Sequence, residues 1–590
     1  MKKNPTVTTK QNICKFLLNQ FKLLLLAALA ITSNSYAASD FLWAKQGQFY
    51  FNGYGVALAA DPAGNVYSIG YFSGTTDFDP GAGIFNMTAV GKSDAFILKL
   101  DKDGNFVWVK QIGGSDDDNA VGVHADAAGN LYVCGIFKSN SIDIDPGAGT
   151  STLVKSGTQD AYALKLDASG NFVWGKQFGG GTSECNVYSM ATDGTGNVVF
   201  GGYFSGTADF DPGSAVSSMT SKSADYDGFI CKLTNTGAFA WCKQFEGDNF
   251  NGVSNIAADA SGNVYATGIF EELMDSDPGV SVKNLATAGA VDVFVIKLDA
   301  SGNFVWSAQG GGTEPDWARG IAVDATGNVF VTGTFDGKAN FDPAGAGYHL
   351  TSVGGTWSPD AFVLKLNAAG KFSWVKQAGT ISPEEVSGIA LDAAGNIYIT
   401  GSFTGVMDVD PGPAATYLTS TNDIDMFIWK LDASGNLVWA KNTVENTVLG
   451  RSKGCSIAVD GAQNVYTIGK FDGSVDFDPG TGKFDMNSSD GSEFIFKIGT
   501  KSGSAIAEKK AGNELMVVPN PFNEKCIIHS TVPMKNGLII VRNVLGQVVQ
   551  KHSNISGNSF ETDLSHHPSG TYILELHSSE RIATTKIIKE

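Results

Sequence analysis

Pairs of aspartates recur six times in the sequence, each pair two residues apart and followed by Pro-Gly. Two carboxylates at this spacing can supply several oxygens to a hard cation such as Ca²⁺. Aspartate in a tight turn also accepts hydrogen bonds from backbone amides, and the proline fixes the φ angle that follows. Recurrence favours the turn role, and calcium binding stays open as the alternative. The pairs are Asp77 and Asp79, Asp143 and Asp145, Asp209 and Asp211, Asp275 and Asp277, Asp408 and Asp410, and Asp476 and Asp478.

Other side chains that could complete a catalytic site are scarce between residues 38 and 500. The only arginines there are Arg319 and Arg451, too few for the arginine clamp with which a sialidase holds its substrate. The only histidines are His124 and His349, so a serine or cysteine nucleophile has few bases to pair with. A pair of carboxyl groups with different pKa values could still catalyse the reaction of a glycosidase or lyase.

The N-terminus has the pattern of a secretory signal peptide over residues 1–37. Five lysines precede an apolar run at 23–31, and the small residues Ser35 and Ala37 predict cleavage before Ala38. The run is about half as long as a bilayer-spanning helix, and no later stretch is apolar for long enough to span. Since the segment holds five lysines and no acid, its loss takes the net charge from -19 to -24. Such a balance disfavours a nucleic-acid partner.

The marker Asn, preceded by Gly in all but the last copy, defines seven repeats of 65 to 68 residues. Each repeat contains four short runs of alternating apolar residues, such as 320–324, 328–335, 360–366 and 372–377 in the fifth repeat. β-Branched and aromatic residues fill these runs, and Asp, Gly and Asn separate them, which predicts four strands joined by tight turns. Four strands in about 66 residues make one blade of a β-propeller, and seven blades make a ring. The markers are Asn65, Asn130, Asn197, Asn263, Asn328, Asn396 and Asn464.

The two ends of the repeat array are complementary. A tryptophan marks the fourth strand, and its first copy, at 41–46, stands before any complete repeat, whereas the last repeat stops after its third strand at 494–498. We therefore predict that the N-terminal strand completes the last blade and closes the ring. Because these tryptophans occupy one position on one type of strand, we expect them to pack inside the protein and not to form an exposed platform for sugars. They are Trp43, Trp108, Trp174, Trp241, Trp306, Trp374 and Trp439.

The connections that vary between repeats are expected on one face of the ring, where ligand selection would occur. They are acidic with aromatic residues among them, which suits a cation, a sugar or a basic protein surface. The fifth repeat also departs from the Asp-x-Asp pattern, with Asn340 and Asp342 at the two positions. The aromatic residues on this face are Tyr50, Phe51, Tyr54, Phe250 and Trp317.

Six cysteines remain after cleavage, and they are scattered without disulfide-framework or zinc spacing. Cys231 and Cys242 fall on neighbouring strands of one predicted hairpin and could face each other. The sequence does not fix their register, so small buried thiols are the favoured interpretation.

The motifs DAxGNVYxxG, DFDPG, DAFxLKLD and GNFVWxKQ together resemble the SBBP-type β-propeller repeat family, over residues 38–500. The resemblance implies the propeller architecture. It implies no particular activity, because propellers host many.

A different module follows a Gly-, Ser- and Lys-rich linker at 501–513. Residues 514–590 contain alternating runs at 538–544 and 571–576, which predict a small β-sandwich. The elements PNPF at 519–522, the run at 536–549, the run at 563–576 and the terminal KIIKE resemble the C-terminal sorting domain of type IX secretion cargo from Bacteroidetes. This resemblance implies recognition by the outer-membrane secretion machinery, removal of the domain, and release or surface attachment.

The sequence thus predicts an all-β chain that is exported through the periplasm to the outer-membrane surface or the medium. We expect a non-catalytic binding or adhesion module whose ligand is a glycan or a protein, with no cofactor other than the possible calcium. A polysaccharide-active enzyme that uses Asp or Glu, and a structural envelope protein, remain as alternatives.

Overall fold

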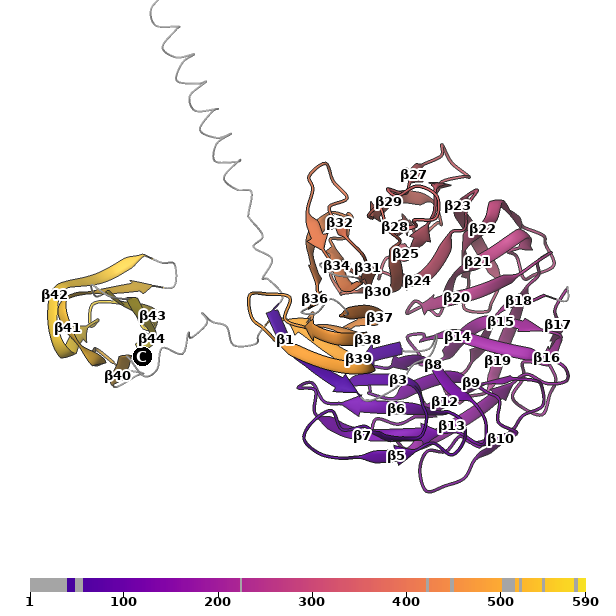
Figure 1. Cartoon of the computed structure of the whole chain (residues 1–590), viewed down its shortest axis with the longest axis horizontal. Coiled ribbons are helices and arrows are strands. Elements are labelled where there is room, and N and C mark those ends of the chain that lie inside the picture. The colour runs from indigo at the N-terminus through magenta and orange to yellow at the C-terminus, as the bar shows by residue number, and fades with distance from the viewer. Residues whose placement is uncertain are drawn as a thin grey trace, which may run out of the picture. The chain divides into compact units, whose positions relative to one another are not determined.

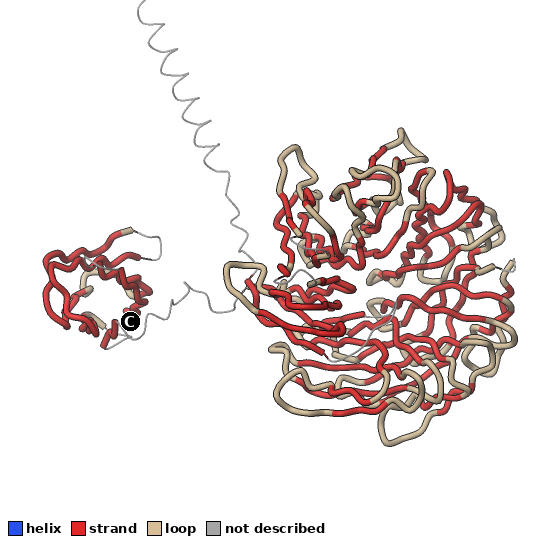
Figure 2. The backbone as a smooth tube through the Cα atoms, in the orientation of Figure 1, coloured by secondary structure: helices blue, strands red, loops and turns tan. Residues whose placement is uncertain are grey.

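The computed structural model describes residues 40–47, 57–222, 225–420, 424–445, 450–500, 515–518, 523–543, 547–577 and 582–589. The predicted signal peptide and linker lie outside these residues. The chain divides into two compact units, Met1–Thr500 and Lys501–Glu590. Within the described residues all regular structure is β-strand (Figures 1 and 2), as expected for an all-β chain.

Each repeat of the first unit forms one antiparallel sheet whose four main strands follow chain order. The first sheet contains β2 (Ala57–Ala60), β3 (Val66–Phe72), β6 (Asp94–Leu100) and β7 (Phe106–Ile112). The second contains β8 (Asp118–Ala125), β9 (Leu131–Phe137), β12 (Asp160–Leu166) and β13 (Phe172–Phe178). The third contains β14 (Glu184–Thr192), β15 (Val198–Ser205), β18 (Asp227–Leu233) and β19 (Phe239–Phe245).

The later repeats form sheets with the same strand order. The fourth sheet contains β20 (Asn251–Ala258), β21 (Val264–Asp275), β22 (Asn284–Leu298) and β23 (Phe304–Gly312). The fifth contains β24 (Trp317–Val323), β25 (Val329–Phe335), β28 (Asp360–Leu366) and β29 (Phe372–Ala378). The sixth contains β30 (Glu385–Leu391), β31 (Ile397–Phe403), β34 (Asp425–Leu431) and β35 (Leu437–Asn442). The last contains β37 (Arg451–Val459), β38 (Val465–Asp476), β39 (Asp485–Gly499), the short β36 (Val444–Glu445) and β1 (Asp40–Gly47).

Short two-stranded ribbons occupy the connections between second and third strands. Their strands are three residues long, and the first strand of each ribbon ends at the first position of the Asp-x-Asp segment, which is Asn340 in the fifth repeat. The ribbon of the fifth repeat also pairs with β23 of the fourth sheet. They are β4 (Thr75–Asp77) with β5 (Asn86–Thr88), β10 (Ser141–Asp143) with β11 (Thr152–Val154), β16 (Thr207–Asp209) with β17 (Ser218–Thr220), β26 (Lys338–Asn340) with β27 (His349–Thr351), and β32 (Val406–Asp408) with β33 (Tyr417–Thr419).

The hydrophobic core lies between neighbouring sheets. Strand β28 reads DAFVLKL and is buried along almost its whole length, because both faces of the sheet are covered. One core cluster joins Val293 and Val295 of the fourth sheet to Val331 and Leu364 of the fifth. Burying one such aliphatic side chain stabilises the fold by about 1.5–3 kcal/mol.

The first strand of each sheet lies toward the middle of the unit (Figure 1) and contacts the first strand of the next sheet. This succession runs from β2 through β8, β14, β20, β24 and β30 to β37, which contacts β2 again. The innermost strands therefore follow one another around a closed circuit.

The N-terminal strand completes the last sheet, as the complementary ends of the repeat array predicted. β1 pairs with β39 in antiparallel register from Asp40↔Gly499 to Gly47↔Glu493. The Trp43 indole also donates to the backbone oxygen of Lys102 in the first sheet, at 3.2 Å. The two ends of the unit are thus joined by backbone hydrogen bonds.

The second unit is a five-stranded antiparallel sheet made of β40 (Leu515–Val518), β41 (Lys525–Asn543), β42 (Val548–Asp563), β43 (Gly570–His577) and β44 (Ile582–Lys589). The long β41 pairs with β40 through its first half and with β43 through its second, while β42 runs along both. One core cluster contains Ile528 from the first half of β41 and Ile539 from the second.

Candidate functional site

The aspartate pairs that could bind calcium form hydrogen-bonded turns. Asp77 accepts the backbone N–H groups of Asp79 and Phe85 through Oδ1, at 3.1 and 2.7 Å, and Asp79 accepts that of Gly81 at 2.8 Å. The same contacts recur at Asp143 and Asp145, Asp209 and Asp211, Asp275 and Asp277, Asp408 and Asp410, and Asp476 and Asp478.

The fifth repeat shows that this turn needs an oxygen acceptor and no negative charge. Asn340 accepts the N–H groups of Asp342 and Tyr348 through its amide oxygen, at 3.1 and 3.0 Å. In the part of the chain that the structure describes, no three Asp, Glu, His or Cys side chains are grouped as metal ligands. Calcium binding at these pairs stays a prediction, and the observed contacts account for the aspartates without it.

In five sheets, a second repeated feature links the turn between the first and second strands to a tyrosine ring. Asp61 accepts two backbone N–H groups through Oδ1, and its Oδ2 accepts the Asn65 amide at 2.7 Å and the Tyr67 hydroxyl at 3.1 Å. Equivalent tyrosine contacts occur at Tyr132, Tyr265, Tyr398 and Tyr466. Turn and second strand are therefore held together by one buried carboxylate.

In every sheet but the third, a lysine of the third strand lies over a tyrosine or phenylalanine ring of the second strand. The Nζ atom is 4.6 to 5.0 Å from the ring centroid, a cation–π contact. In several sheets the same Nζ donates to a turn carbonyl of the next sheet, as Lys365 does to Ala433 at 3.0 Å. The pairs are Lys99 with Tyr67, Lys165 with Tyr132, Lys297 with Tyr265, Lys365 with Phe330, Lys430 with Tyr398, and Lys497 with Tyr466.

The third sheet breaks this pattern because Val199 stands where the other sheets have the ring. Without it, Lys232 forms an ion pair with Asp193 at 2.9 Å, and both side chains are buried. Nζ also donates to the Gly262 carbonyl at 3.0 Å. Burial opposes ionisation of Asp193, yet hydrogen bonds from Thr195, Asn197 and Lys232 hold the pKa of its carboxyl down at about 2.

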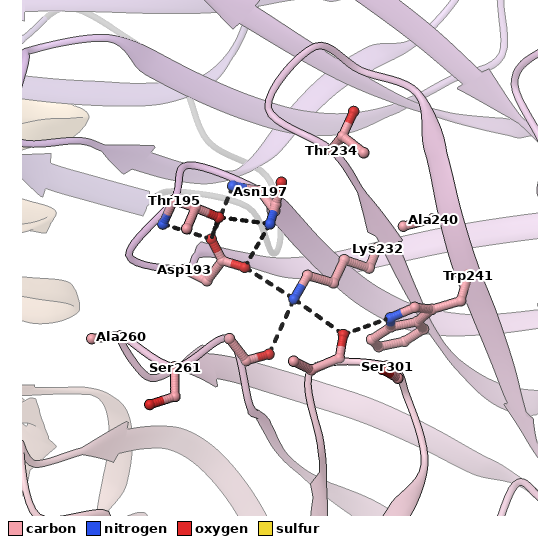
Figure 3. Close-up of a pocket in the computed structure, with 12 residues that line it drawn as sticks. Asp193, Thr195, Asn197, Lys232, Thr234, Ala240, Trp241, Ala260, Ser261 and Ser301 are labelled. Carbon is pink, nitrogen blue, oxygen red and sulfur yellow. Dashed lines mark hydrogen bonds and ion pairs between the residues drawn. The ribbon is translucent and has the colours of Figure 1, made fainter.

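A cavity of about 500 Å³ opens around this ion pair, between turns of the third and fourth sheets (Figure 3). The Trp241 indole forms part of its wall and donates to the Ala300 carbonyl at 3.1 Å. Figure 3 shows the Lys232 side chain directed at both Asp193 and the neighbouring turns. The lining residues are Asp193, Thr195, Asn197, Lys232, Thr234, Ala240, Trp241, Ala260, Ser261, Gly262, Ala300 and Ser301.

A separate aromatic cluster lies where strands β14 and β15 of the third sheet meet the connection to the fourth sheet. Tyr203 packs against Tyr188, Tyr226 and Phe250, with ring centroids 4.8 to 5.3 Å apart. The Tyr226 hydroxyl donates to Glu184 at 3.0 Å. Of the aromatic residues that the sequence placed on this face, Phe250 joins this cluster.

Of the other aromatic residues predicted on this face, the structure describes Trp317. The Trp317 ring packs against the Arg319 guanidinium, 5.3 Å from the ring centroid. Tyr50, Phe51 and Tyr54 lie outside the described residues.

The two histidines of the first unit, His124 and His349, do not form a nucleophile–base pair in the described structure. His124 lies on β8, an innermost strand, where burial lowers the pKa of its ring and Nδ1 is 3.0 Å from the Thr192 hydroxyl. His349 begins the exposed β27. Neither arrangement offers a base beside an activated serine or cysteine.

The structure joins Cys231 and Cys242 in a disulfide, where the sequence favoured free thiols. The two residues are directly opposite each other in the register of β18 and β19, with Cα atoms 4.1 Å apart. This register is what the sequence could not supply. Cys134 and Cys185 are buried free thiols whose pKa values burial raises.

Comparison with known families identifies the class of each unit. A model described as "Beta-propeller repeat" matches residues 305–342 and 373–402, in the fourth, fifth and sixth sheets. The "Secretion system C-terminal sorting domain" model matches residues 516–590, the second unit. The chain therefore contains β-propeller repeats and a type IX secretion sorting domain, and the sorting domain indicates export to the cell surface or the medium. The described residues include no helix that is long and apolar enough to cross a membrane.

Individual relatives are distant. An uncharacterized WD repeat-containing protein of Acanthamoeba polyphaga mimivirus is 24% identical over 73% of this chain, which spans 36% of that protein's length. The crystal structure of Sqt1 from Chaetomium thermophilum is 11% identical, with 73% of this chain and 97% of that chain covered and a TM-score of 0.34. A protein of unknown function from Bacteroides thetaiotaomicron is 10% identical, with 76% and 100% covered and a TM-score of 0.20. Neither structural likeness carries information on function.

Proposed function

We propose that this chain is a seven-bladed propeller that the type IX machinery exports, and that it binds a ligand without catalysing a reaction. The closed circuit of innermost strands and the β1–β39 pairing support the seven-bladed ring. The sorting-domain match supports delivery to the cell surface or the medium. For the sorting domain itself we propose a sandwich, because the two halves of β41 contribute to one core.

One observation carries the binding role: the repeat is broken at Val199, and a cavity lies around the Lys232–Asp193 ion pair that replaces the missing ring contact. In a tandem array, positions that serve packing recur, whereas a single departure that opens space is free to serve a ligand. A volume of about 500 Å³ falls in the range of small-molecule sites.

The lining favours a neutral ligand rich in hydroxyl groups, such as a sugar residue of a glycan. The charge of Lys232 is cancelled by Asp193, so the site offers no net charge to an anion or a cation. Hydroxyl groups of Thr195, Ser261 and Ser301 line the cavity beside the Trp241 ring. Hydroxyls and an aromatic face together suit a ligand that is apolar on one side and polar at its edge.

The same lining disfavours catalysis. The pKa of Asp193 is held at about 2, so this carboxyl does not donate a proton near neutral pH. Elsewhere, Asp316 and Glu384 have raised pKa values, as a general acid would, but they are 0% and 3% exposed. A glycan could not reach them.

The test restores the broken repeat. Val199→Tyr introduces the ring that five other sheets accommodate, so the variant should fold, return Lys232 to a cation–π contact and fill the cavity. We expect retention on a panel of immobilised neutral polysaccharides to fall at least tenfold. Tyr132→Val, which removes a ring from the second sheet, is the matched control and should bind as the unmodified chain does.

Two outcomes would refute the proposal. Undiminished binding by a folded Val199→Tyr chain would remove the cavity as the ligand site. Oligosaccharides released from the panel by the unmodified chain would show catalysis instead of simple binding.

A further inference from the structure

A buried acid lies on the third strand of every sheet, and in five sheets it is the first residue of that strand. The seven side chains are 0 to 1% exposed. Six of them lie beside the segment that enters the next sheet, because the residue before each acid accepts a backbone N–H from that segment. We call each such place a junction. The acids are Asp94, Asp160, Asp227, Asp292, Asp360, Asp425 and Glu493.

At six junctions, the residue that enters the next sheet occupies an equivalent position. Its backbone N–H donates to the carbonyl of the residue that precedes the buried acid, at 2.8 to 3.1 Å. At two of them the residue that enters is Cys185 or Ser452, which donates to Gln159 or Ile424. At the other four it has a carboxyl or amide side chain: Asp118, Asn251, Asp316 and Glu384 donate to Ser93, Tyr226, Val291 and Pro359. The four junctions can therefore be compared atom by atom.

The junction of Asp227 with Asn251 shows what a neutral entering residue does. The Asn251 Nδ2 group donates to Asp227 Oδ1 at 3.3 Å, and the Asn251 Oδ1 atom accepts the Gly228 N–H at 2.8 Å. Asp227 Oδ2 accepts Gln244 and the Lys222 backbone. Both oxygens of the buried acid thus receive hydrogen bonds.

The junction of Asp292 with Asp316 has an acid in place of that asparagine. Asp292 Oδ2 accepts the Ala288 N–H at 2.9 Å, but its Oδ1 has no partner among the described residues. Asp316 accepts the Gly312 and Asp336 N–H groups. Asp292 Oδ1 and Asp316 Oδ2 both lie against the point that a side chain on Gly311 would occupy, so the two carboxyls face each other there.

The junction of Asp360 with Glu384, on the other side of the fifth sheet, also has an acid in place of the asparagine. Asp360 Oδ2 accepts Gln377 and the Val353 N–H, and Glu384 Oε2 accepts the Thr380 N–H at 3.1 Å. Asp360 Oδ1 and Glu384 Oε1 have no partner in the described structure. Two unfilled acceptors at one buried site are costly unless a proton lies between them.

None of the charged groups that the structure describes around these carboxyls is a buried cation that could neutralise their negative charge. The field of Asp336 acts on both Asp316 and Asp360, and Asp336 is itself 5% exposed. Glu314 and Lys338 belong to the segments beside Asp316, and the Lys338 side chain is exposed. Next to Glu384, Glu385 is exposed and paired with Lys453.

The junction of Asp94 with Asp118 is also acidic, but donors compensate for it. Asp118 Oδ2 accepts the Ser139 hydroxyl and the Gly114 N–H, each at 2.7 Å, and Oδ1 accepts two further N–H groups. Two acids at a junction are therefore tolerable when hydroxyl and amide donors surround them. The fifth sheet lacks a hydroxyl donor at Asp316.

We propose that Asp316 and Glu384 are protonated in the folded chain at neutral pH and donate hydrogen bonds to Asp292 and Asp360, as Asn251 does to Asp227. The fifth sheet is then held to both neighbours by proton-sharing carboxyl pairs, which weaken as the pH rises.

The direction of the pKa values agrees with this assignment. Burial, followed by the field of Asp292, raises the pKa of Asp316 to about 8, and burial raises that of Glu384 to about 8. The folded chain then holds more protons than the unfolded chain between the ordinary carboxyl pKa of about 4 and about 8. Stability must fall as the pH rises through that window and level off above it.

Thermal unfolding of the full-length chain provides the test. All ten tryptophans lie in residues 43–439, so their fluorescence reports the propeller unit alone. We expect the unfolding temperature to fall by about 5 °C or more between pH 5 and pH 8.5. Asp316→Asn and Glu384→Gln, which carry their own N–H donors, should each flatten this fall.

Two matched variants control the experiment. Asn251→Asp creates a fourth acidic junction, without a hydroxyl donor, and should steepen the fall, whereas Glu385→Gln, at the exposed neighbour of Glu384, should leave it unchanged. In infrared spectra at pH 7, the band of protonated carboxyl groups should weaken in Asp316→Asn and in Glu384→Gln.

The outcomes that overturn the proposal are distinct. An unchanged pH profile and infrared band in both variants would show that the two acids are not protonated. If Ca²⁺ instead raised the unfolding temperature at pH 8.5 in the unmodified chain and in neither variant, a cation would occupy the pairs in place of protons.

Discussion

The turn aspartates are the residues whose role the sequence indicates most directly. Asp392 accepts two backbone N–H groups, the Asn396 amide and the Tyr398 hydroxyl, the last at 3.0 Å. Replacing it with alanine leaves these donors without an acceptor, so we expect Asp392→Ala to lower the free energy of unfolding by about 2–3 kcal/mol. Denaturant unfolding followed by tryptophan fluorescence measures the loss.

Asp432 is the control for this prediction, because it holds the same kind of turn on the more exposed hairpin. It accepts Ser434, Asn436 and the Asn436 amide, but no tyrosine. Asp432→Ala should cost less than about 1 kcal/mol, since water can replace its contacts. Equal losses in the two variants would show that the buried tyrosine contact adds nothing.

The disulfide makes a second prediction at the scale of residues. Of the six cysteines after residue 37, Cys134, Cys185, Cys455 and Cys526 are free in the structure. Alkylation of the unfolded exported chain without reductant should therefore modify four thiols, and with reductant six. Six modified thiols in both conditions would show that the pair is reduced.

The energetic effect of the disulfide follows from its loop. Cys231 and Cys242 are 11 residues apart, so the bond restricts a short segment of the unfolded chain. We expect Cys231→Ser to lower the free energy of unfolding by about 2–3 kcal/mol. Cys526→Ser, in the sorting domain, should leave the tryptophan-monitored transition where it is.

Residue roles were predictable where a contact is local in sequence and were missed where it crosses between sheets. The turn role of the aspartate pairs follows from residues two to eight positions apart. The sequence shows that Val199 stands where other repeats have an aromatic residue. The consequence depends on Lys232, which lies on a different strand and would otherwise contact that ring. The proximity of Asp292 and Asp316 could likewise not be predicted, because it depends on the path of the segment that connects the two sheets.

At the scale of elements, the repeat fixed most strands to within a residue or two. The third strand expected at 360–366 is β28 (Asp360–Leu366), and the second, expected at 328–335, is β25 (Val329–Phe335). The first strand, expected at 320–324, begins earlier, at Trp317. An irregularity between Ala318 and Gly320 shifts the register there and interrupts the alternation of side chains. The short ribbons were not predicted, because strands of three residues are too short to show the alternation of apolar and polar residues.

The closing strand gives a prediction about an element. A chain that begins at residue 48 lacks β1 and leaves the outer edge of β39 unpaired, so its unfolding temperature should fall and the exposed edge should favour association. Size-exclusion chromatography and tryptophan fluorescence measure the two effects. A peptide of residues 38–47 added in trans should reverse both.

Removal of residues 501–590 is the control for the loss of β1, because these residues form a separate compact unit. The tryptophan-monitored transition should not move. If loss of β1 changed stability no more than this control did, the β1–β39 pairing would not be what closes the ring.

For the whole molecule, the repeat and the tail were recognisable from sequence because each is a pattern of many residues. The proposed ligand site was not recognisable, since it depends on one departure among seven copies of the repeat. We propose that the second unit directs secretion and that the first unit binds the ligand, with no residue shared between the two roles. Each function should therefore be removable without the other.

Deletion of residues 514–590 tests this separation. The truncated chain lacks the sorting domain and should accumulate in the periplasm of the producing cell, while the full chain reaches the surface or the medium. Immunoblots of cell fractions measure the distribution, and the Val199→Tyr chain, expected to be exported normally, is the control. The truncated chain should still bind the neutral polysaccharide that the full chain binds. Truncated chain in the medium of intact cells would contradict the role of the tail, whereas loss of binding on truncation would show that the two units act together.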